Sequence, residues 1–134
     1  EMYPSDAPQF GDNNSVNYIN FQENLDFLDT EEGKGDMEVI PNDKVEVHYT
    51  GWLSDGCVFD STYPRGATAK FRIGQGQVIA GWDLGIPGMK EGGTRRLQIG
   101  SDLAYGKDGI PGVIPENSTL IFEVKLIKII RLVK

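Results

Sequence analysis

"AYGKDGIPGVIPENSTLIFEVKLIKII", residues 104–130, joins a tyrosine and two Gly/Pro-rich turns to the most apolar segment of the chain. Within residues 118–132, alternation places Leu120, Phe122, Val124 and Leu126 on one face, which predicts the longest strand of the fold. The turn-rich segment ahead of this strand has two interpretations. It closes a long hairpin, or it forms one wall of an apolar pocket.

Upstream of this stretch, shorter apolar runs alternate with turn signals. Residues 44–53, KVEVHYTGWL, alternate Val45, Val47 and Tyr49 with polar residues and stop at a Ser-Asp-Gly turn, which predicts a strand. Residues 18–29 fit either a helical face or a strand, and we predict a short first strand near 24–30 because strand signals dominate the chain from residue 37 onward. Further strands are predicted at residues 57–60, 69–74 and 93–100.

One segment has helical spacing instead. In residues 78–89, VIAGWDLGIPGM, the residues Ile79, Trp82 and Ile86 recur at intervals of three and four. This pattern predicts one amphipathic helix of about two to three turns, interrupted by Gly85 and stopped near Pro87. One helix among several antiparallel strands indicates an α+β fold, with a curved sheet wrapped around the helix and Trp82 between them.

The charges divide the chain into two parts. Residues 1–33 hold eight acids and no Lys or Arg, whereas residues 34–134 hold thirteen bases and twelve acids, which together give the net charge of −7. Residues 1–17 are also rich in Pro, Asp, Asn and Ser. We therefore predict an acidic flexible N-terminal tail over residues 1–21 and one folded domain over residues 22–134.

Composition excludes several classes of protein. A nearly neutral domain lacks the basic stripe that nucleic-acid binding requires. The sequence also contains no apolar run of about 18 residues, so no membrane-spanning helix is predicted. The single cysteine, Cys57, excludes an internal disulfide framework and is compatible with a reducing compartment, so we expect a cytoplasmic protein. With one histidine, His48, out of phase with Tyr49 in its strand, neither a closed zinc site nor a nucleophile and base pair is expected.

Aromatic residues remain as the candidate chemistry. A β-sheet curled around one helix would bring six aromatic residues together: Tyr49, Phe59, Phe71, Trp82, Tyr105 and Phe122. Tyrosine and tryptophan carry polar groups that need partners when buried, so this set suits a lined cavity better than a plain core.

Three long blocks of the sequence resemble one family. "VEVHYTGWLSDGCVFDST", "FRIGQGQVIAGWDLGIPGMKEGG" and "AYGKDGIPGVIPENSTLIFEVKL" closely resemble an FKBP-type peptidyl-prolyl cis-trans isomerase domain, and the resemblance covers roughly residues 24–131. The resemblance implies a curved antiparallel β half-barrel around one short α-helix, prolyl isomerase activity, and binding of the macrolides tacrolimus and rapamycin. It implies no metal and no cofactor.

The resemblance also implies the site residues. Asp60, Trp82, Tyr105 and Phe122 take the catalytic positions, with Trp82 as the pocket floor and the Tyr105 hydroxyl as a donor to a substrate or drug carbonyl. The amide nitrogens of Ile79 and Ile114 are implied as backbone contacts. The substrate and macrolide positions are Tyr49, Phe59, Asp60, Arg65, Phe71, Val78, Ile79, Trp82, Tyr105, Ile110, Val113, Ile114 and Phe122. Two of the residues at the rim depart from the family pattern: Ala69 replaces a frequent aromatic residue and Ile110 a frequent histidine.

Two functions stay open at this point. One is an active isomerase that rotates Xaa-Pro bonds in peptides and proteins, and the other is an FKBP-fold binding module with weak isomerase activity. We expect a monomer whose partners are proline-containing chains, the two macrolides, and a protein that docks on the 104–117 loop or the acidic tail. A third hypothesis is that the tail folds over the pocket and regulates it.

Overall fold

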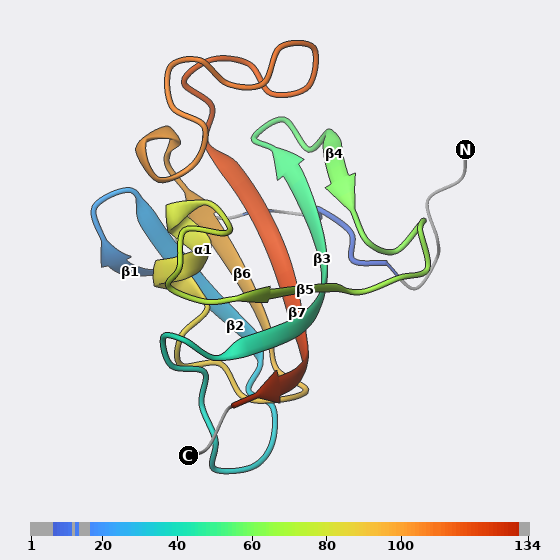
Figure 1. Ribbon diagram of the computed structural model, residues 1–134. Coiled ribbons are helices and arrows are strands. Elements are labelled where there is room, and N and C mark those ends of the chain that lie inside the picture. The colour runs from blue at the N-terminus through green and yellow to red at the C-terminus, as the bar shows by residue number, and fades with distance from the viewer. Residues whose placement is uncertain (1–6, 12, 14–16, 132–134) are drawn as a thin grey trace.

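The computed structural model describes residues 7–11, 13 and 17–131. Its centre is a seven-stranded antiparallel sheet in the order β1-β2-β6-β7-β3-β4, with β5 paired to β3. The strands are β1 (Ile19–Gln22), β2 (Leu25–Glu31), β3 (Lys44–Leu53), β4 (Val58–Ser61), β5 (Ala69–Arg72), β6 (Thr94–Ile99) and β7 (Leu120–Ile130). The helix α1 (Ala80–Gly85) and a short 3-10 turn (Ser101–Leu103) complete the elements. Figure 1 shows the sheet curving around α1, which confirms the predicted half-barrel.

Strand alternation decides which side chains meet the helix. Gly51 of β3 pairs with Phe122 of β7, and Phe122 pairs with Leu97 of β6, so these three positions lie on one face of the sheet. The helix packs on that face with Trp82, followed by Ile86 directly after the helix, and the main core forms between helix and sheet. Because successive side chains of a strand point to opposite faces, the neighbouring positions point to the outer face.

The helix lies close to the sheet because small residues face it. A Cβ atom added at Gly81 would lie 2.6 Å from side-chain atoms of Ile99, and one added at Gly85 would lie 2.8 Å from Leu97. Real Cβ contacts of this length are excluded by van der Waals repulsion, so both positions require glycine at this helix-to-sheet distance. The glycines that weaken the helix intrinsically are therefore the ones that let Trp82 reach the sheet.

Two predicted boundaries differ from the structure. The helix spans six residues rather than most of 78–89, and it ends at Gly85, where the chain turns towards Pro87. A strand in residues 19–22 was not predicted: β1 pairs with β2 in antiparallel register, so the boundary expected between residues 21 and 22 falls inside a strand. Two of its four residues are apolar, but all four are exposed, so no buried face marks this strand. Residues 1–6, 12 and 14–16 of the predicted tail lie outside the described residues.

The other strands match their predictions closely, and β2 occupies the segment for which the sequence permitted both a helix and a strand. Among the described helices, none has the length and apolar character needed to cross a membrane.

Candidate active site

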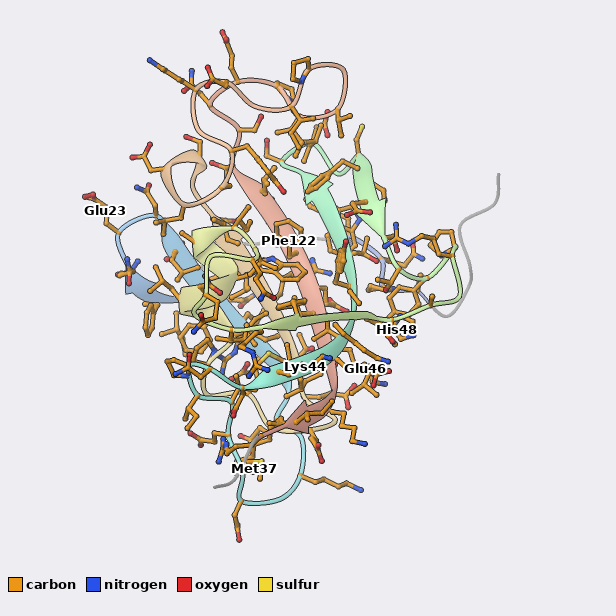
Figure 2. All side chains as sticks on the ribbon, in the orientation of Figure 1. Glu23, Met37, Lys44, Glu46, His48 and Phe122 are labelled. Carbon is orange, nitrogen blue, oxygen red and sulfur yellow. The ribbon has the colours of Figure 1, made fainter. Side chains whose placement is uncertain are left out.

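A cavity of about 170 Å³ opens between the helix and the inner face of the sheet. Separate elements supply its walls: β3 and β4 on one side, the segment leading into α1 on another, the loop after β6, and β7 behind. Figure 2 shows Phe122 in the middle of the molecule beside α1, whereas His48 lies well away from it. The lining residues are Tyr49, Phe59, Asp60, Gln77, Val78, Ile79, Trp82, Tyr105 and Phe122.

Edge-to-face aromatic contacts build the cavity around Trp82. Its ring centroid lies 4.9 Å from that of Tyr49 and 5.1 Å from that of Phe122, with interplanar angles of 85° and 83°. Phe59 contacts Phe122 in the same way at 5.5 Å, and Phe71 supports Trp82 from behind at 5.3 Å. These geometries suit aromatic quadrupoles and hold the rings in fixed orientations.

The indole N–H of Trp82 is buried, and no hydrogen-bond partner for it exists among the described residues. Trp82 as a whole is only 5% exposed, so water has little access to this group. An unpaired donor in such surroundings costs about 1–3 kcal/mol. The floor of the cavity is therefore apolar except for the indole N–H of Trp82, which has no hydrogen-bond partner among the described residues.

A polar network borders the cavity on the β4 side. The Tyr49 hydroxyl donates to Asp60 Oδ2 at 2.5 Å, and Arg65 Nη1 donates to Asp60 Oδ1 at 3.1 Å. Burial of the phenol, together with the adjacent Asp60, raises the pKa of Tyr49 to about 12. The hydrogen bond to Asp60 likewise raises the pKa of Arg65. Both charged side chains are partly exposed, so this ion pair orients the Asp60 carboxylate more than it stabilises the fold.

Tyr105 supplies a hydroxyl from the loop that follows β6. The residue is 39% exposed, and within the part of the chain that the structure describes its hydroxyl makes no hydrogen bond. Burial of part of the ring raises the pKa of Tyr105, and the Asp60 charge adds to the effect. The hydroxyl therefore stays protonated at neutral pH and is free to donate to a bound molecule.

The structure brings most of the predicted site residues together. Eight of them line the cavity: Tyr49, Phe59, Asp60, Val78, Ile79, Trp82, Tyr105 and Phe122. Phe71 and Arg65 lie one layer behind, where they contact Trp82 and Asp60 respectively. The backbone N–H of Ile79 makes no hydrogen bond among the described residues, as a ligand contact would require.

The far part of the 104–117 loop is arranged differently from the expectation. Val113 is 47% exposed, and it lines a separate hollow of about 310 Å³ together with Ile114. Ile110 packs partly against the core. The backbone N–H of Ile114 donates to the Ile110 carbonyl at 2.8 Å, so the backbone contact expected of Ile114 is already used inside the loop. The loop thus supplies Tyr105, but neither Val113 nor Ile114, to the lining of the cavity.

Gln77 is a lining residue that the sequence analysis missed. Its side-chain carbonyl accepts a hydrogen bond from the Arg72 backbone N–H at 2.9 Å, which fixes the amide at the end of β5. A glutamine in a Gly-rich turn carries no signal in the sequence pattern. Its position directly before Val78 and Ile79 is the one hint that it shares their wall.

A hollow of about 230 Å³ lies elsewhere and has a different character. Its lining is mostly charged, and Arg95, one of its two basic residues, is bound to Asp29 at 2.6 Å and to the carbonyls of Gly85 and Pro87. Arg95 thereby ties β2 to the end of the helix, so we assign this hollow a structural origin.

Comparisons with known proteins agree with this geometry. Residues 35–127 match the family model described as FKBP-type peptidyl-prolyl cis-trans isomerase. The chain is 52% identical over 94 residues to the peptidyl-prolyl cis-trans isomerase FPR2 of Saccharomyces cerevisiae, covering 69% of this chain and 70% of that protein. It is 52% identical over 99 residues to the FK506-binding protein 1A of Neurospora crassa, covering 74% and 82%.

A solved structure is similar as well. The crystal structure of AtFKBP13 superimposes with a TM-score of 0.72 at 42% identity, covering 78% of this chain and 91% of that one. The aromatic cavity, the half-barrel and the sequence matches converge on one assignment. The chain belongs to the FKBP-type peptidyl-prolyl cis-trans isomerase family.

Proposed function

We propose that the cavity around Trp82 accelerates rotation about Xaa-Pro bonds in peptide and protein substrates by stabilising a twisted amide without covalent chemistry. Amide resonance opposes this rotation with a barrier of about 18–20 kcal/mol for an ordinary peptide bond, and uncatalysed Xaa-Pro exchange takes tens to hundreds of seconds. A twisted amide has lost resonance, so its carbonyl is less polarised than that of the planar ground state. An apolar cavity therefore favours the twisted form over the planar one.

The observation that carries this proposal is the free Tyr105 hydroxyl at an aromatic cavity whose floor is Trp82. The proline ring packs against the indole, and the carbonyl that precedes it accepts from Tyr105 or from the Ile79 N–H. Because a less polarised carbonyl is a weaker acceptor, these hydrogen bonds favour the twisted form through their alignment with the turned carbonyl. Lowering the barrier by about 5 kcal/mol would give a rate several thousandfold above the uncatalysed one.

Asp60 completes the proposed site. Its carboxylate faces the cavity and is held by Tyr49 and Arg65 at 2.5 and 3.1 Å. We assign it two effects: it fixes the Tyr49 ring against Trp82, and it places negative charge beside the rotating amide. Replacing Asp60 by Val removes both effects while keeping a side chain of similar size.

We also propose that tacrolimus and rapamycin bind in this cavity and compete with substrate. The support is family membership and the similarity to proteins whose names record FK506 binding. Ala69 and Ile110, which depart from the family pattern, are both only partly buried. We therefore expect differences in macrolide affinity from other family members to arise at the rim of the cavity.

A protease-coupled assay on a peptide with one Xaa-Pro bond tests the function. We expect the wild-type chain to accelerate exchange, rapamycin to suppress the acceleration, and Asp60→Val to reduce the rate while the far-UV CD spectrum stays unchanged. Rapamycin binding without acceleration would instead favour the binding module. An Asp60→Val rate equal to that of wild type would show that the site is elsewhere.

The remaining expectations about partners extend this proposal. We propose that a protein partner docks on the exposed 104–117 loop, where Val113 and its neighbours form the second hollow. The monomeric state and the cytoplasmic location stay predictions.

A further inference from the structure

The outer face of the sheet carries a second apolar cluster. Trp52 of β3 and Ile121 of β7 are paired across the strands on the face opposite the helix, yet they are only 2% and 1% exposed. Neither residue belongs to the main core. Something other than the helix must cover them, because an outer-face tryptophan beside an isoleucine would otherwise be exposed.

Part of that cover is the segment of residues 7–11, which we call the N-terminal arm. The Phe10 ring packs edge-on against Trp52 with a centroid distance of 5.7 Å, and Ala7 is itself buried. Pro8 lies in a hollow that it shares with Glu123 and Lys125 of β7. Figure 1 shows this segment, in dark blue, next to β3 on the side away from α1. The described arm therefore lies on the face opposite the cavity, and not over the cavity as one hypothesis from the sequence had it.

Arg96 fastens the arm to the sheet. Its guanidinium donates to the carbonyls of Phe10 and Gln9 at 2.7 and 2.8 Å, and to Glu123 at 2.9 Å. It also stacks over Trp52 at 4.8 Å. Arg96 is buried, so its guanidinium N–H groups need hydrogen-bond acceptors from the protein. The carbonyls of Gln9 and Phe10 supply two of these acceptors.

The arm also contacts the hairpin that carries the cavity wall. A Cβ atom added at Gly56, in the turn between β3 and β4, would lie 3.2 Å from the Phe10 ring. On the other side of this hairpin lie Phe59 and Asp60, on β4, which is an edge strand paired only with β3. An edge strand has one neighbour to hold it, so contacts on the outer side of its hairpin influence its position.

We propose that Phe10 is a positioning residue for the isomerase cavity, and that the arm is a strap that holds the β3–β4 hairpin in its binding-competent position. The inference rests on the proposed function and adds to it a segment that lies outside the family match, which begins at residue 35. When the strap is lost, the hairpin samples positions in which Phe59 and Asp60 do not form the wall. Substrate then binds only the competent fraction of molecules, so KM rises while kcat, set in the bound state, is unchanged.

The test uses the full chain with Phe10→Ala. A competent fraction of about one half to one fifth raises KM about two- to fivefold with unchanged kcat. The matched control is Gln9→Ala, because among the described residues the Gln9 side chain hydrogen-bonds only to the Ala7 carbonyl and the Gln9 backbone carbonyl stays available to Arg96. Phe10→Tyr keeps the ring and is expected to restore the wild-type KM.

The outcomes separate the strap from a merely structural role. If Phe10 serves stability alone, Phe10→Ala lowers kcat in proportion to the unfolded fraction and leaves KM unchanged, which overturns the proposal. Wild-type values of both constants overturn it as well. If the wild type shows no acceleration, the proposed function fails, and the strap is then judged by the rapamycin Kd, which must rise about two- to fivefold in Phe10→Ala for the same reason.

A spectroscopic measurement reports the docking itself. The chain has two tryptophans, so Trp82→Phe leaves Trp52, on the face of the sheet opposite the cavity, as the single indole. In this background Phe10→Ala is expected to shift the Trp52 emission to longer wavelength as the ring becomes hydrated. An unchanged spectrum would contradict arm docking directly.

Discussion

Gly51→Ala probes the packing of the cavity wall from the inside. Gly51 lies on β3 opposite Phe122, and its φ angle is not in the positive region, so the backbone itself accepts alanine. A Cβ atom there would nevertheless lie 2.7 Å from Phe59 Cζ and 2.8 Å from Phe122 Cε1. Carbon atoms in contact sit about 3.5–4.0 Å apart, so both contacts must open by roughly 1 Å.

The two rings differ in their freedom to move. Phe122 is buried in a central strand and contacts Trp82, whereas Phe59 is half-buried on the edge strand β4. We therefore expect both rings to shift and Phe59 to move the farther of the two. Overpacking costs about 1–3 kcal/mol, and replacing glycine in a strand returns about 0.5–1 kcal/mol, so the free energy of unfolding falls by about 0.5–2 kcal/mol. A displaced Phe59 ring distorts the wall, and a loss of about 1.4 kcal/mol in transition-state binding lowers kcat/KM about tenfold.

Urea unfolding followed by CD, together with the protease-coupled assay, measures both effects. Phe59→Leu provides the partner for a double-mutant cycle, because leucine lacks the Cζ atom that the new methyl group would meet. We expect the double variant to be more stable than the sum of the two single changes implies. Additive free energies, or a Gly51→Ala variant with wild-type stability and kcat/KM, would refute the reasoning.

The other predictions concern a free donor, a buried carboxylate paired with a partly exposed arginine, and two phenols. Tyr105→Phe removes a hydroxyl that has no partner in the described structure, so the unfolding midpoint stays unchanged while kcat/KM falls about threefold to tenfold, as expected for one hydrogen bond. Asp43→Ala removes a buried carboxylate that accepts from Arg131 at 2.8 Å, and urea titration should show a loss of about 1.5–3 kcal/mol. Burial raises the pKa values of Tyr18 and Tyr49 from 10.0 to about 12, so between these pH values the unfolded chain loses its phenol protons first. Stability is therefore complete below pH 10 and declines as the pH rises towards 12, which thermal melts at stepped pH will follow.

Controls and contrary results are available for each. Asp36→Ala changes an exposed carboxylate and should leave the urea midpoint at the wild-type value, whereas an equal loss at both aspartates would deny Asp43 a special role. A stability curve that stays flat from pH 8 to 12 would mean that neither phenol is protected by burial. A wild-type rate for Tyr105→Phe would remove its hydroxyl from the proposed mechanism.

The strands of the centre were predictable because they obey a simple rule. Val45, Val47 and Tyr49 alternate with polar residues over the first part of β3, and Phe122, Val124 and Leu126 alternate with Glu123 and Lys125 in β7, so the hydrophobic period predicted the type and the inner face of these segments. The same rule fails at β1, whose Ile19 and Phe21 are exposed and whose other residues are polar. Its pairing with β2 comes from backbone hydrogen bonds, which leave no trace in side-chain type.

The candidate site was predictable in its identities but not in its distances. Trp82, Tyr105 and Asp60 were expected from the resemblance, and the structure places all three on one cavity. Sequence could not show that the Ile114 N–H is already bound within its loop, or that Gln77 shares the wall. Those facts depend on how loops fold back, and loop geometry follows from many weak contacts between residues distant in the chain.

By themselves the alternation of apolar residues and the helical spacing around Trp82 indicated a curved sheet wrapped around one helix, and the resemblance to the family implied that this sheet is a half-barrel. Only the tertiary structure decided where the N-terminal arm packs. Phe10 and Arg96 are 86 positions apart, and no local pattern connects them. They meet because the outer face of the sheet leaves Trp52 uncovered, and burying that indole favours bringing the distant segment back across the strands.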